Sequence, residues 1–547
     1  MTGHARKLTQ RIPRHGSVAV LAAALVMGIG TTVLPSGSAT ARVDAPIAQV
    51  DAGEPRYDPS NAPIVFLPGL LGSELQCGPI DVDEVNLWPG AADDALTWLP
   101  RFSGLGLINT MDGSGSISSR TQSSDDYPFG CGQQAYGPGQ VAENEPTPKQ
   151  PTWCVPEKRD DEEGPFETCP IDLASAAYNT FGYQLEAAAS SGRPILMYAW
   201  DWRKDPADQV AQLANEITSL TSAKGVKVTV VAHSFGNSLF RALVERIESE
   251  GNDAGYFIGR FLGVASPWWG VSTAWEHGAF GEIQPGFASA LLAERVGPQT
   301  VMDLFASSPG PYTLFPTPMF DDFVAKGSTT DGEHWLAAPV GGVSTWIAPD
   351  GVADIVAEQF DSCPDSSVFP CLSEDLYIEA ADAMSSPGFD TSGIRDWVGI
   401  VGSGVDTALQ ICSDCTTWPD GSTDGQLITE DAGANSVTTH RIRMTDGDGN
   451  VPVFSAIQGT DPQAPPGDSI PFYFTCGIDH MGLMTDQGVL DQTIPYVLGT
   501  GDLSYGDTFQ TNPNGTDACS SPIPTPSPST TVVPAVPIIP VALPQTR

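Results

Sequence analysis

The feature that most constrains the fold is an apolar strand pattern that runs through a serine directly into a helix. Residues 227–247 read KVTVVAHSFGNSLFRALVERI, with Ser234 at the junction. Two interpretations fit: a nucleophile elbow, which exposes the serine at a sharp turn, or an ordinary strand–turn–helix. Ala232 and Gly236 favour the elbow, because its bend needs small residues two positions before and after the nucleophile. The motif alone does not separate the two interpretations.

Further β-rich segments recur along the chain, with helical patterns between several of them. They lie at 62–69, 194–200, 226–233, 260–266, 397–403, 440–445 and 470–477, and one helical pattern spans 208–223. Nearly continuous apolar strands that alternate with amphipathic helices are typical of a mostly parallel sheet covered on both faces. The predicted fold class is therefore α/β.

Two long stretches interrupt this alternation, at about 78–192 and 268–395. Both are too long for simple loops in a compact domain, so we expect insertions with structure of their own. The core domain with its insertions is predicted to extend over 42–519. Residues 520–547 carry a proline at nearly every third or fourth position, which predicts an extended, disordered tail.

The N-terminus has the pattern of a secretory signal peptide. Basic residues precede the apolar run SVAVLAAALVMGIGTTVL, which leads to small residues and an Ala39-x-Ala41 cleavage pattern. Residues 1–41 therefore predict secretion into the extracellular space, or retention at the cell surface. The alternative is a single transmembrane anchor, for which the apolar run is short.

Composition agrees with export and disfavours one class of partner. The chain has 66 acidic and 25 basic residues, and its formal net charge of −41 disfavours binding to nucleic acid. The even number of cysteines, 10, points to disulfides in an exported protein. Cys412-x-x-Cys415 stands without a second pair or a nearby histidine, so a disulfide is a better interpretation than a zinc site.

If Ser234 is a nucleophile, a histidine must follow it in the chain, because the order in elbow hydrolases is serine, acid, histidine. Four histidines follow: His277, His334, His440 and His480. The catalytic one is expected just after the last core strand, and the segment IPFYFTCGIDHMGL places His480 there. His440 opens a predicted strand, and the other two fall in the second insertion.

The acid is expected at a strand end between Ser234 and His480, and RIRMTDGDGNVPV offers two carboxylates, Asp446 and Asp448. We favour Asp448, because an exposed turn followed by a return to β-like residues suits an acid that orients a histidine. A calcium-binding loop is excluded. Its sixth and twelfth positions would be Val451 and Ile457, where such a loop needs glycine and glutamate.

An oxyanion hole needs two backbone N–H groups that face the developing negative charge. One is expected from Phe235, the residue after the nucleophile. The other is expected from Leu70, because Pro68 and Gly69 turn the chain just after an early strand in FLPGLLGSEL. The alternative for this segment is a simple glycine-rich turn. His233 also precedes Ser234, but strand alternation points its side chain away from the serine.

The motifs VFLPGLLGSELQ, YAWDWRKDP, VVAHSFGN, GVASPWWG, DGDGNVP and GIDHMGL occur in the order and spacing of the lecithin:cholesterol acyltransferase family. The chain resembles most the lysosomal phospholipase A2 branch, which also has Ala-His-Ser at the elbow. The resemblance covers roughly residues 60–500 and implies an α/β-hydrolase fold. It makes Ser234 the nucleophile, Asp448 the acid and His480 the base. SPWWG departs from the family's Pro-Trp-Gly-Gly, so Trp269 stands where a small residue is usual.

The predicted function is therefore a secreted serine lipase or phospholipase with O-acyltransferase capability. An acyl-Ser234 intermediate would pass its acyl group to water or to a lipid alcohol, and no metal or organic cofactor is required. The partners are a lipid ester, either phospholipid or acylglycerol, and a membrane or lipid-particle surface. The alternatives are an esterase for small soluble esters, a secreted peptidase, and a non-enzymatic lipid-binding surface protein.

Aromatic residues are the candidates for lipid contact. In the first insertion VNLWPGAADDALTWLPRFSGLGL gathers Trp88, Trp98 and Phe102, and amphipathic aromatics suit a membrane interface. Trp268 and Trp269 follow the strand at 260–266 and are candidates to line an acyl or acceptor pocket. For all five the alternative is ordinary packing over the core.

Overall fold

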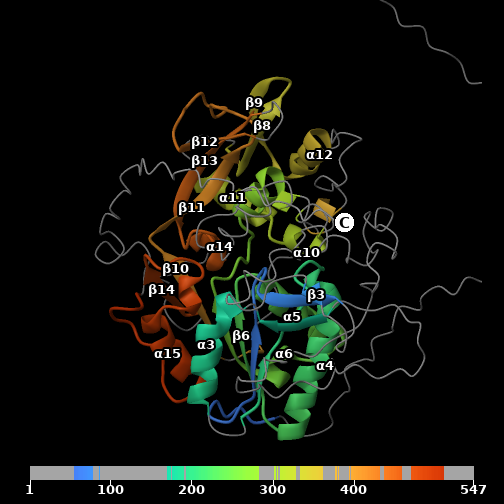
Figure 1. Cartoon of the computed structure of the whole chain (residues 1–547), viewed down its shortest axis with the longest axis vertical. Coiled ribbons are helices and arrows are strands. Elements are labelled where there is room, and N and C mark those ends of the chain that lie inside the picture. Colours follow the sequence, from blue (N-terminus) through green and yellow to red (C-terminus); the bar gives the residue numbers. More distant parts are fainter. Residues whose placement is uncertain are drawn as a thin grey trace, which may run out of the picture. The chain divides into compact units, whose positions relative to one another are not determined.

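Six of the seven predicted strands form one parallel sheet, in the order β14-β10-β7-β6-β1-β5. Figure 1 labels three of them, β14, β10 and β6. Every neighbouring pair in this sheet is parallel. The strands are β1 (Ile64–Leu67), β5 (Ile195–Met197), β6 (Val228–His233), β7 (Ile258–Val264), β10 (Asp396–Ser403) and β14 (Phe472–Cys476). The predicted α/β class is confirmed.

The structure is a computed structural model. It describes residues 55–77, 85–86, 169–173, 175–189, 193–281, 301–302, 305, 308–327, 333–360, 376–378, 380, 393–394, 396–431, 437–458 and 470–510. All of these lie in the unit Pro46–Arg547. The predicted signal peptide, the tail 520–547, most of the first insertion and the limits of the core domain lie outside these residues and stay predictions.

Alternate residues of each sheet strand face opposite layers of helices, as the pleat of a strand requires. Ile64 and Phe66 of β1 pack in a cluster with α3 (Ser175–Ala188) and α15 (Gln487–Leu498). Val65 and Leu67 pack in a second cluster, with α4 (Pro206–Lys224), α5 (Gly236–Ser249) and α6 (Ala254–Phe257). Burial on both faces explains why these strands read as continuous apolar runs.

Local residue chemistry sets the ends of α4, the helix predicted over 208–223. The Asp205 side chain accepts a hydrogen bond from the N–H of Ala207, and Pro206 occupies the first turn, where no N–H partner is needed. Gly225 ends the helix at φ +64°, a left-handed conformation that favours glycine. The helix prediction is therefore confirmed to within two residues at each end.

The seventh predicted strand, 440–445, does not belong to the parallel sheet. It is the middle of β13 (Val437–Gly447), in a second sheet of order β12-β13-β11-β8-β9. The other strands are β12 (Gln426–Asp431), β11 (Val405–Cys412), β8 (Leu336–Val340) and β9 (Val343–Ile347). β13 pairs antiparallel with both β11 and β12. The sequence predicted this segment as a strand, but its local pattern does not reveal which strands it pairs with.

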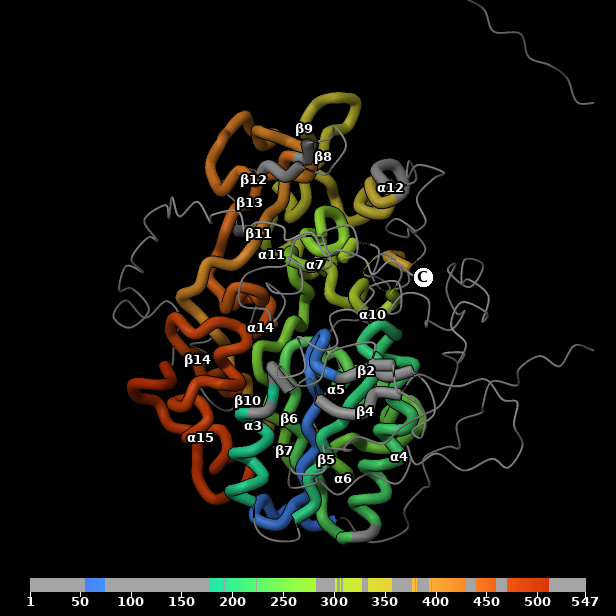
Figure 2. Tube along the Cα trace, viewed as in Figure 1, coloured from blue at the N-terminus to red at the C-terminus, as the bar shows by residue number. Residues whose placement is uncertain are grey.

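The described parts of the two insertions contain regular structure. The second insertion includes α7 (Thr273–Trp275), the π-helix η3 (Glu276–Phe280), α10 (Pro309–Tyr312), α11 (Pro318–Gly327), β8, β9 and α12 (Pro349–Phe360). A small antiparallel sheet joins β2 (Ser73–Cys77), β3 (Val85–Asn86) and β4 (Cys169–Leu173). Although α3 falls within 78–192, it packs on the parallel sheet as a core helix. Figure 2 shows this course of the chain.

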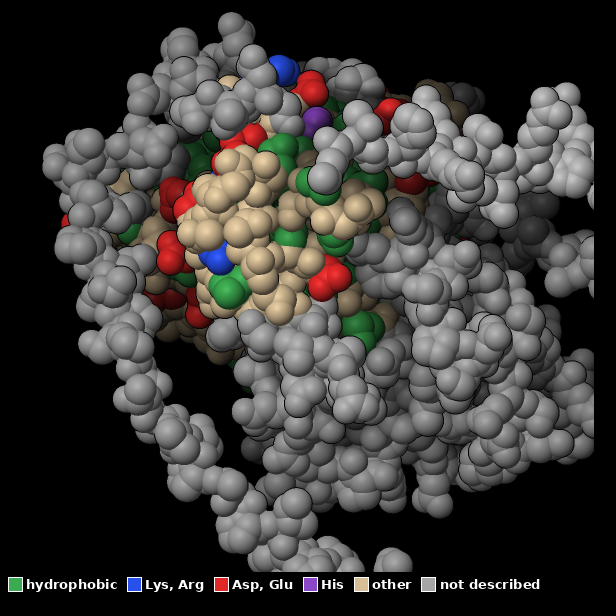
Figure 3. All heavy atoms as spheres, turned by 90° about the horizontal axis from the view of Figure 1, so that it is seen from above, with side chains coloured by type: hydrophobic (Ala, Val, Ile, Leu, Met, Phe, Trp, Pro, Cys, Tyr) green, Lys and Arg blue, Asp and Glu red, His purple; other side chains and the backbone are tan. Residues whose placement is uncertain are grey.

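The short helices α14 (Val453–Ala456) and η4 (Gly482–Met484) complete the described elements. Within the described part of the chain, no helix is long and apolar enough to cross a membrane. Acidic side chains are scattered over the described part of the face in Figure 3, where Lys and Arg are few, in line with the net charge of −41.

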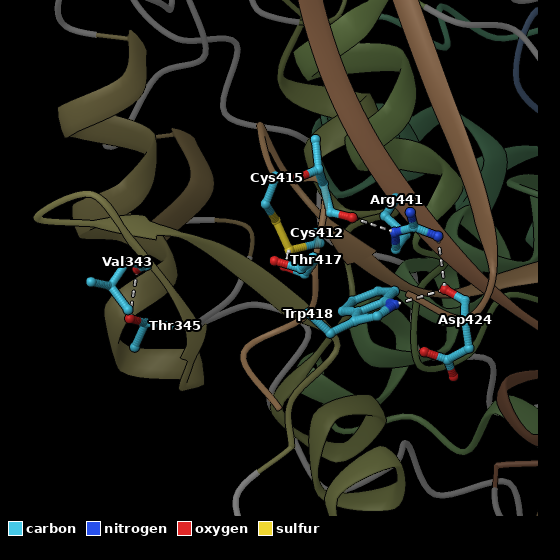
Figure 4. The surroundings of a disulfide bond; sticks show 9 residues. Val343, Thr345, Cys412, Cys415, Thr417, Trp418, Asp424 and Arg441 are labelled. Atoms are coloured by element: carbon cyan, nitrogen blue, oxygen red, sulfur yellow. Dashed lines mark hydrogen bonds between the residues drawn. A yellow bond between two sulfur atoms is a disulfide. The ribbon is translucent and has the colours of Figure 1, made fainter. Parts of the chain in front are cut away.

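Cys412 and Cys415 form a disulfide at the end of β11, as the sequence favoured over zinc (Figure 4). The segment that follows is held by hydrogen bonds to the backbone. The Trp418 indole N–H donates to the carbonyl of Asp424 (2.9 Å), and Arg441 Nε donates to the carbonyl of Thr416 (2.9 Å). The disulfide therefore closes a turn that packs against the second sheet.

Cys412 and Cys415 should resist alkylation in denatured protein that has not been reduced, because the disulfide leaves no thiol to react. After reduction both should be alkylated, and peptide mass spectrometry reports the two states. Alkylation of either cysteine before reduction would contradict the disulfide.

Candidate active site

The junction between β6 and α5 has the geometry of a nucleophile elbow. Ser234 adopts φ +54°, a left-handed conformation that is strained for any residue with a Cβ atom. Its N–H donates to the carbonyl of Val264 on β7 (2.9 Å), which holds the turn against the neighbouring strand. A Cβ atom at Gly236 would lie 2.2 Å from the Leu67 carbonyl oxygen. The requirement for a small residue there is therefore steric, as predicted.

Ser234, His480 and Asp448 form a chain of short hydrogen bonds. His480 Nε2 lies 2.8 Å from Ser234 Oγ, and His480 Nδ1 lies 2.8 Å from Asp448 Oδ2. The three residues are 8%, 2% and 1% exposed, so the chain is almost fully shielded from solvent. These are the three residues that the sequence selected for the triad, and the structure brings them together.

Asp448, not Asp446, is the carboxylate that contacts His480. The second oxygen of Asp448, Oδ1, accepts from the N–H groups of Asn450 (2.9 Å) and Val451 (2.7 Å), which fix the orientation of the carboxylate. Asp446 instead accepts from Ser403 Oγ (2.6 Å) and from the N–H of Gly404 (2.5 Å). Asp446 thus joins the end of β10 to β13.

The loop after β1 brings Leu70 beside Ser234. Both residues line the same pocket, while Phe235 is fully buried at the start of α5. Trp200 Nε1 donates to the Pro68 carbonyl (2.9 Å) and holds the loop in place. Among the described residues, neither the N–H of Leu70 nor that of Phe235 donates to a protein acceptor. Their part in an oxyanion hole stays a prediction.

The pocket at Ser234 and His480 is mostly apolar. Apolar side chains of the second insertion, with Val271, Ala274 and Leu314 among them, line it together with His277. The sequence placed His277 in this insertion and gave it no role. Its position on the pocket wall was not predictable, because the insertion shows no pattern that fixes its distance from the triad.

Trp268 and Trp269 do not line this pocket as the sequence suggested. Trp268 is buried against Phe261 and Trp397, with ring centroids 6.4 and 5.7 Å away, and is therefore a packing residue. Trp269 is half-buried and lies near Phe323 and Phe454, at 6.2 and 6.5 Å. The other aromatic candidates for lipid contact, Trp88, Trp98 and Phe102, lie outside the described residues.

Two buried polar residues beside the triad were missed by sequence reasoning. His233 does point away from the Ser234 hydroxyl, but its ring packs on that of His480, with centroids 4.8 Å apart. Tyr178 of α3 contacts His233 through a hydrogen bond of 2.8 Å. Burial, and then the charge on neighbouring His480, lower the pKa of His233 well below its ordinary value. His233 is therefore neutral where an exposed histidine titrates.

A parallel sheet that presents a strained serine between strand and helix, with histidine and aspartate in order, defines the chain as an α/β-hydrolase. The family model described as lecithin:cholesterol acyltransferase matches residues 177–338. This match confirms the family resemblance drawn from the motifs. It covers Ser234 but ends before Asp448 and His480. The likeness to the lysosomal phospholipase A2 branch stays a prediction.

No curated protein matches the chain. Among solved structures it is similar to the one titled "The crystal structure of Tle4-Tli4 complex", at 13% identity and a TM-score of 0.41. That similarity covers 81% of this chain and 99% of the other. It is also similar to the mature Bacillus licheniformis lipase BlEst2, at 12% identity and a TM-score of 0.16, over 58% of this chain and 79% of that one. The fold assignment rests on the topology of the parallel sheet in this chain and not on these similarities.

Replacing Gly236 by alanine should destabilise the protein by about 1–3 kcal/mol, because the new methyl group collides with backbone atoms of residues 67 and 68. Chemical denaturation measures the loss. The matched control is Gly506→Ala, where an added Cβ meets nothing within 4 Å. Equal stability of the two variants would argue against the close approach at the elbow.

Proposed function

We propose that the chain is a secreted serine acyl hydrolase that acts on lipid esters and transfers the acyl group to water or to a lipid alcohol. The observation that carries the chemistry is the buried Ser234–His480–Asp448 hydrogen-bond chain, which opens on an apolar pocket. The family match supports a lipid ester as substrate, because the matching model is named for an enzyme that uses lecithin.

The first half of the reaction forms an acyl-enzyme. His480 Nε2 accepts the proton of Ser234 as Oγ attacks the ester carbonyl, so one C–O bond forms while the carbonyl electrons move to oxygen. The N–H groups of Leu70 and Phe235 stabilise that oxyanion. When the tetrahedral intermediate collapses, His480 gives its proton to the leaving alcohol or lyso-lipid.

Asp448 makes this proton transfer favourable. Its carboxylate accepts from His480 Nδ1, which keeps Nε2 free to accept the serine proton and stabilises the imidazolium that forms. Two backbone N–H groups and the low exposure of the carboxylate hold it in one orientation. Because these N–H donors already hold the carboxylate in place, little free energy is spent on reorganisation in the transition state.

The second half decides between hydrolysis and transfer. Water or a lipid alcohol attacks the acyl-Ser234 ester with His480 as general base, and Ser234 is regenerated. Transfer requires an acceptor bound beside the acyl-enzyme where water is excluded. The apolar lining of the pocket and the family name support an alcohol acceptor. Hydrolysis of phospholipid is the basal activity in this proposal.

Export and membrane contact belong to the same proposal. The pattern of residues 1–41 supports secretion, and the disulfide between Cys412 and Cys415 suits an oxidising compartment. Trp88, Trp98 and Phe102 support peripheral contact with a lipid surface, because amphipathic aromatics favour that interface. No cofactor takes part.

Replacing Ser234 by alanine should lower ester hydrolysis by about 10⁴–10⁶-fold, because the nucleophile is lost. Purified protein is given liposomes of labelled phosphatidylcholine with or without a sterol or long-chain alcohol, and free fatty acid and new ester are quantified. Ser249→Ala, the same change at an exposed position of α5, is the control.

Three outcomes would revise the proposal. Fatty acid alone, whatever the acceptor, would limit the protein to a lipase. Cleavage of short soluble esters without release from phospholipid would make it an esterase. Full activity of Ser234→Ala would remove Ser234 from the mechanism.

Asp448→Asn should lower kcat by about 10⁴-fold, the loss known for a triad aspartate, while Asp446→Asn should lose much less. The reason is that only Asp448 contacts the His480 ring. Steady-state kinetics on a soluble ester compare the pair, and the opposite ranking would make Asp446 the acid.

A further inference from the structure

A second hydrogen-bond chain runs behind the triad and joins the two halves of the site. The N–H of Gly69 donates to the Tyr178 hydroxyl (2.8 Å), and that hydroxyl lies 2.8 Å from His233 Nδ1. His233 Nε2 lies 3.1 Å from the backbone carbonyl of His480. Tyr178 is 2% exposed and His233 is fully buried, so solvent does not compete with these bonds.

The partners at the two ends determine where each proton lies. The His480 carbonyl can only accept, so His233 Nε2 carries a proton and donates it. In neutral His233 the other nitrogen, Nδ1, is then an acceptor, and the Tyr178 hydroxyl must donate to it. The hydroxyl oxygen remains free to accept from the Gly69 N–H. Each donor in this hydrogen-bond chain thus has one acceptor, and all of its bonds point the same way, from the Gly69 N–H to the His480 carbonyl.

The loop of residues 68–72, here called the oxyanion loop, packs closely around Tyr178. An added Cβ at Gly72 would lie 2.6 Å from Cε2 of the Tyr178 ring. An added Cβ at Gly69 would lie 3.1 Å from the Tyr178 hydroxyl and 2.7 Å from Ser234 Cβ. The loop therefore packs closely against both Tyr178 and Ser234, and Leu70 directly follows the glycine that touches both.

Electrostatics favour the neutral form of His233. Burial disfavours its imidazolium, and the ring of His480 packs directly on it. Burial likewise raises the pKa of Tyr178, so its hydroxyl keeps its proton. A proton on His233 Nδ1 would leave the Tyr178 hydroxyl hydrogen without its acceptor. The groups that face His233 thus all support one tautomer.

From these contacts we infer that Tyr178 and His233 are positioning residues that tie the oxyanion loop to the backbone of the catalytic histidine. The inference rests on the proposed acyl-transfer function. The pair holds the Leu70 N–H and the His480 main chain at fixed positions relative to each other. The oxyanion donor and the general base therefore keep their distances from Ser234. Neither residue lines the pocket at Ser234.

The test compares Tyr178→Phe, His233→Leu and the double variant with wild type on a soluble ester. Tyr178→Phe keeps the ring that packs on Phe66 (centroids 5.1 Å apart) and removes only the hydroxyl. Its kcat should fall by about 10–100-fold with KM little changed, because an oxyanion donor is worth about 10²–10³ in kcat and is here displaced rather than lost. The matched control is Tyr198→Phe, a buried tyrosine whose hydroxyl donates to the Gln209 carbonyl (3.2 Å).

The double variant separates positioning from packing. If the two residues act through one chain, the double variant should be no slower than the slower single variant. Wild-type kcat in Tyr178→Phe, a rise in KM alone, or losses that multiply in the double variant would each overturn the inference. Thermal unfolding accompanies each assay. If His233→Leu does not fold, the comparison of Tyr178→Phe with Tyr198→Phe still decides.

A second readout does not depend on catalysis. Nitrogen NMR of histidine-labelled wild type, with His233 assigned by its absence in His233→Leu, should show the neutral Nε2–H form near pH 6.5, where a free histidine is half charged. A charged ring or the Nδ1–H form would overturn the inference. A wild type without activity on any ester would instead refute the proposed function, and the NMR result would still test the hydrogen-bond chain.

Discussion

The left-handed turn at Ser234 is the constraint on which the site depends. A φ of +54° in a residue with a side chain costs free energy that the surroundings must supply. Here the Ser234 N–H is bonded to β7, and its carbonyl accepts from the Asn237 side chain (2.9 Å). Gly236 lets α5 begin against the end of β1. Three neighbouring parallel strands thus hold the serine where their carboxyl ends meet, and the other catalytic groups are placed relative to it.

The sequence predicted those parts of the fold and site that depend on local pattern. Buried parallel strands appear as apolar runs because both faces are covered, and the elbow appears as small residues around Ser234 because a sharp bend excludes side chains. His480 followed from chain order together with its place just after the last core strand. Tyr178 was not predicted, because its contact with His233 joins residues 55 positions apart and leaves no periodic trace. His277 was missed because no pattern in the second insertion places it on the pocket wall.

The second sheet was not predicted, and the reason is physical. β13 (VTTHRIRMTDG) is mostly polar, and no property of residues 440–445 identifies its hydrogen-bond partners, β11 and β12. The choice of Asp448 did not depend on the sheet, because it relied on a carboxylate in a turn after a strand. That argument holds whichever sheet contains the strand.

The route by which Asp448 reaches His480 gives the second sheet a part in the site. β11 follows β10 directly and pairs antiparallel with β13, which returns the chain to the end of β10. Val405 pairs with Gly447 and also bridges Asp448. A slip of one residue in this register would turn the carboxylate to the opposite face and move it by about 3.3 Å. Gly402 permits the close approach, since a Cβ there would lie 2.5 Å from Asp448 Cβ. The pairing of β11 with β13, although it lies outside the parallel sheet, therefore decides which carboxylate faces the histidine.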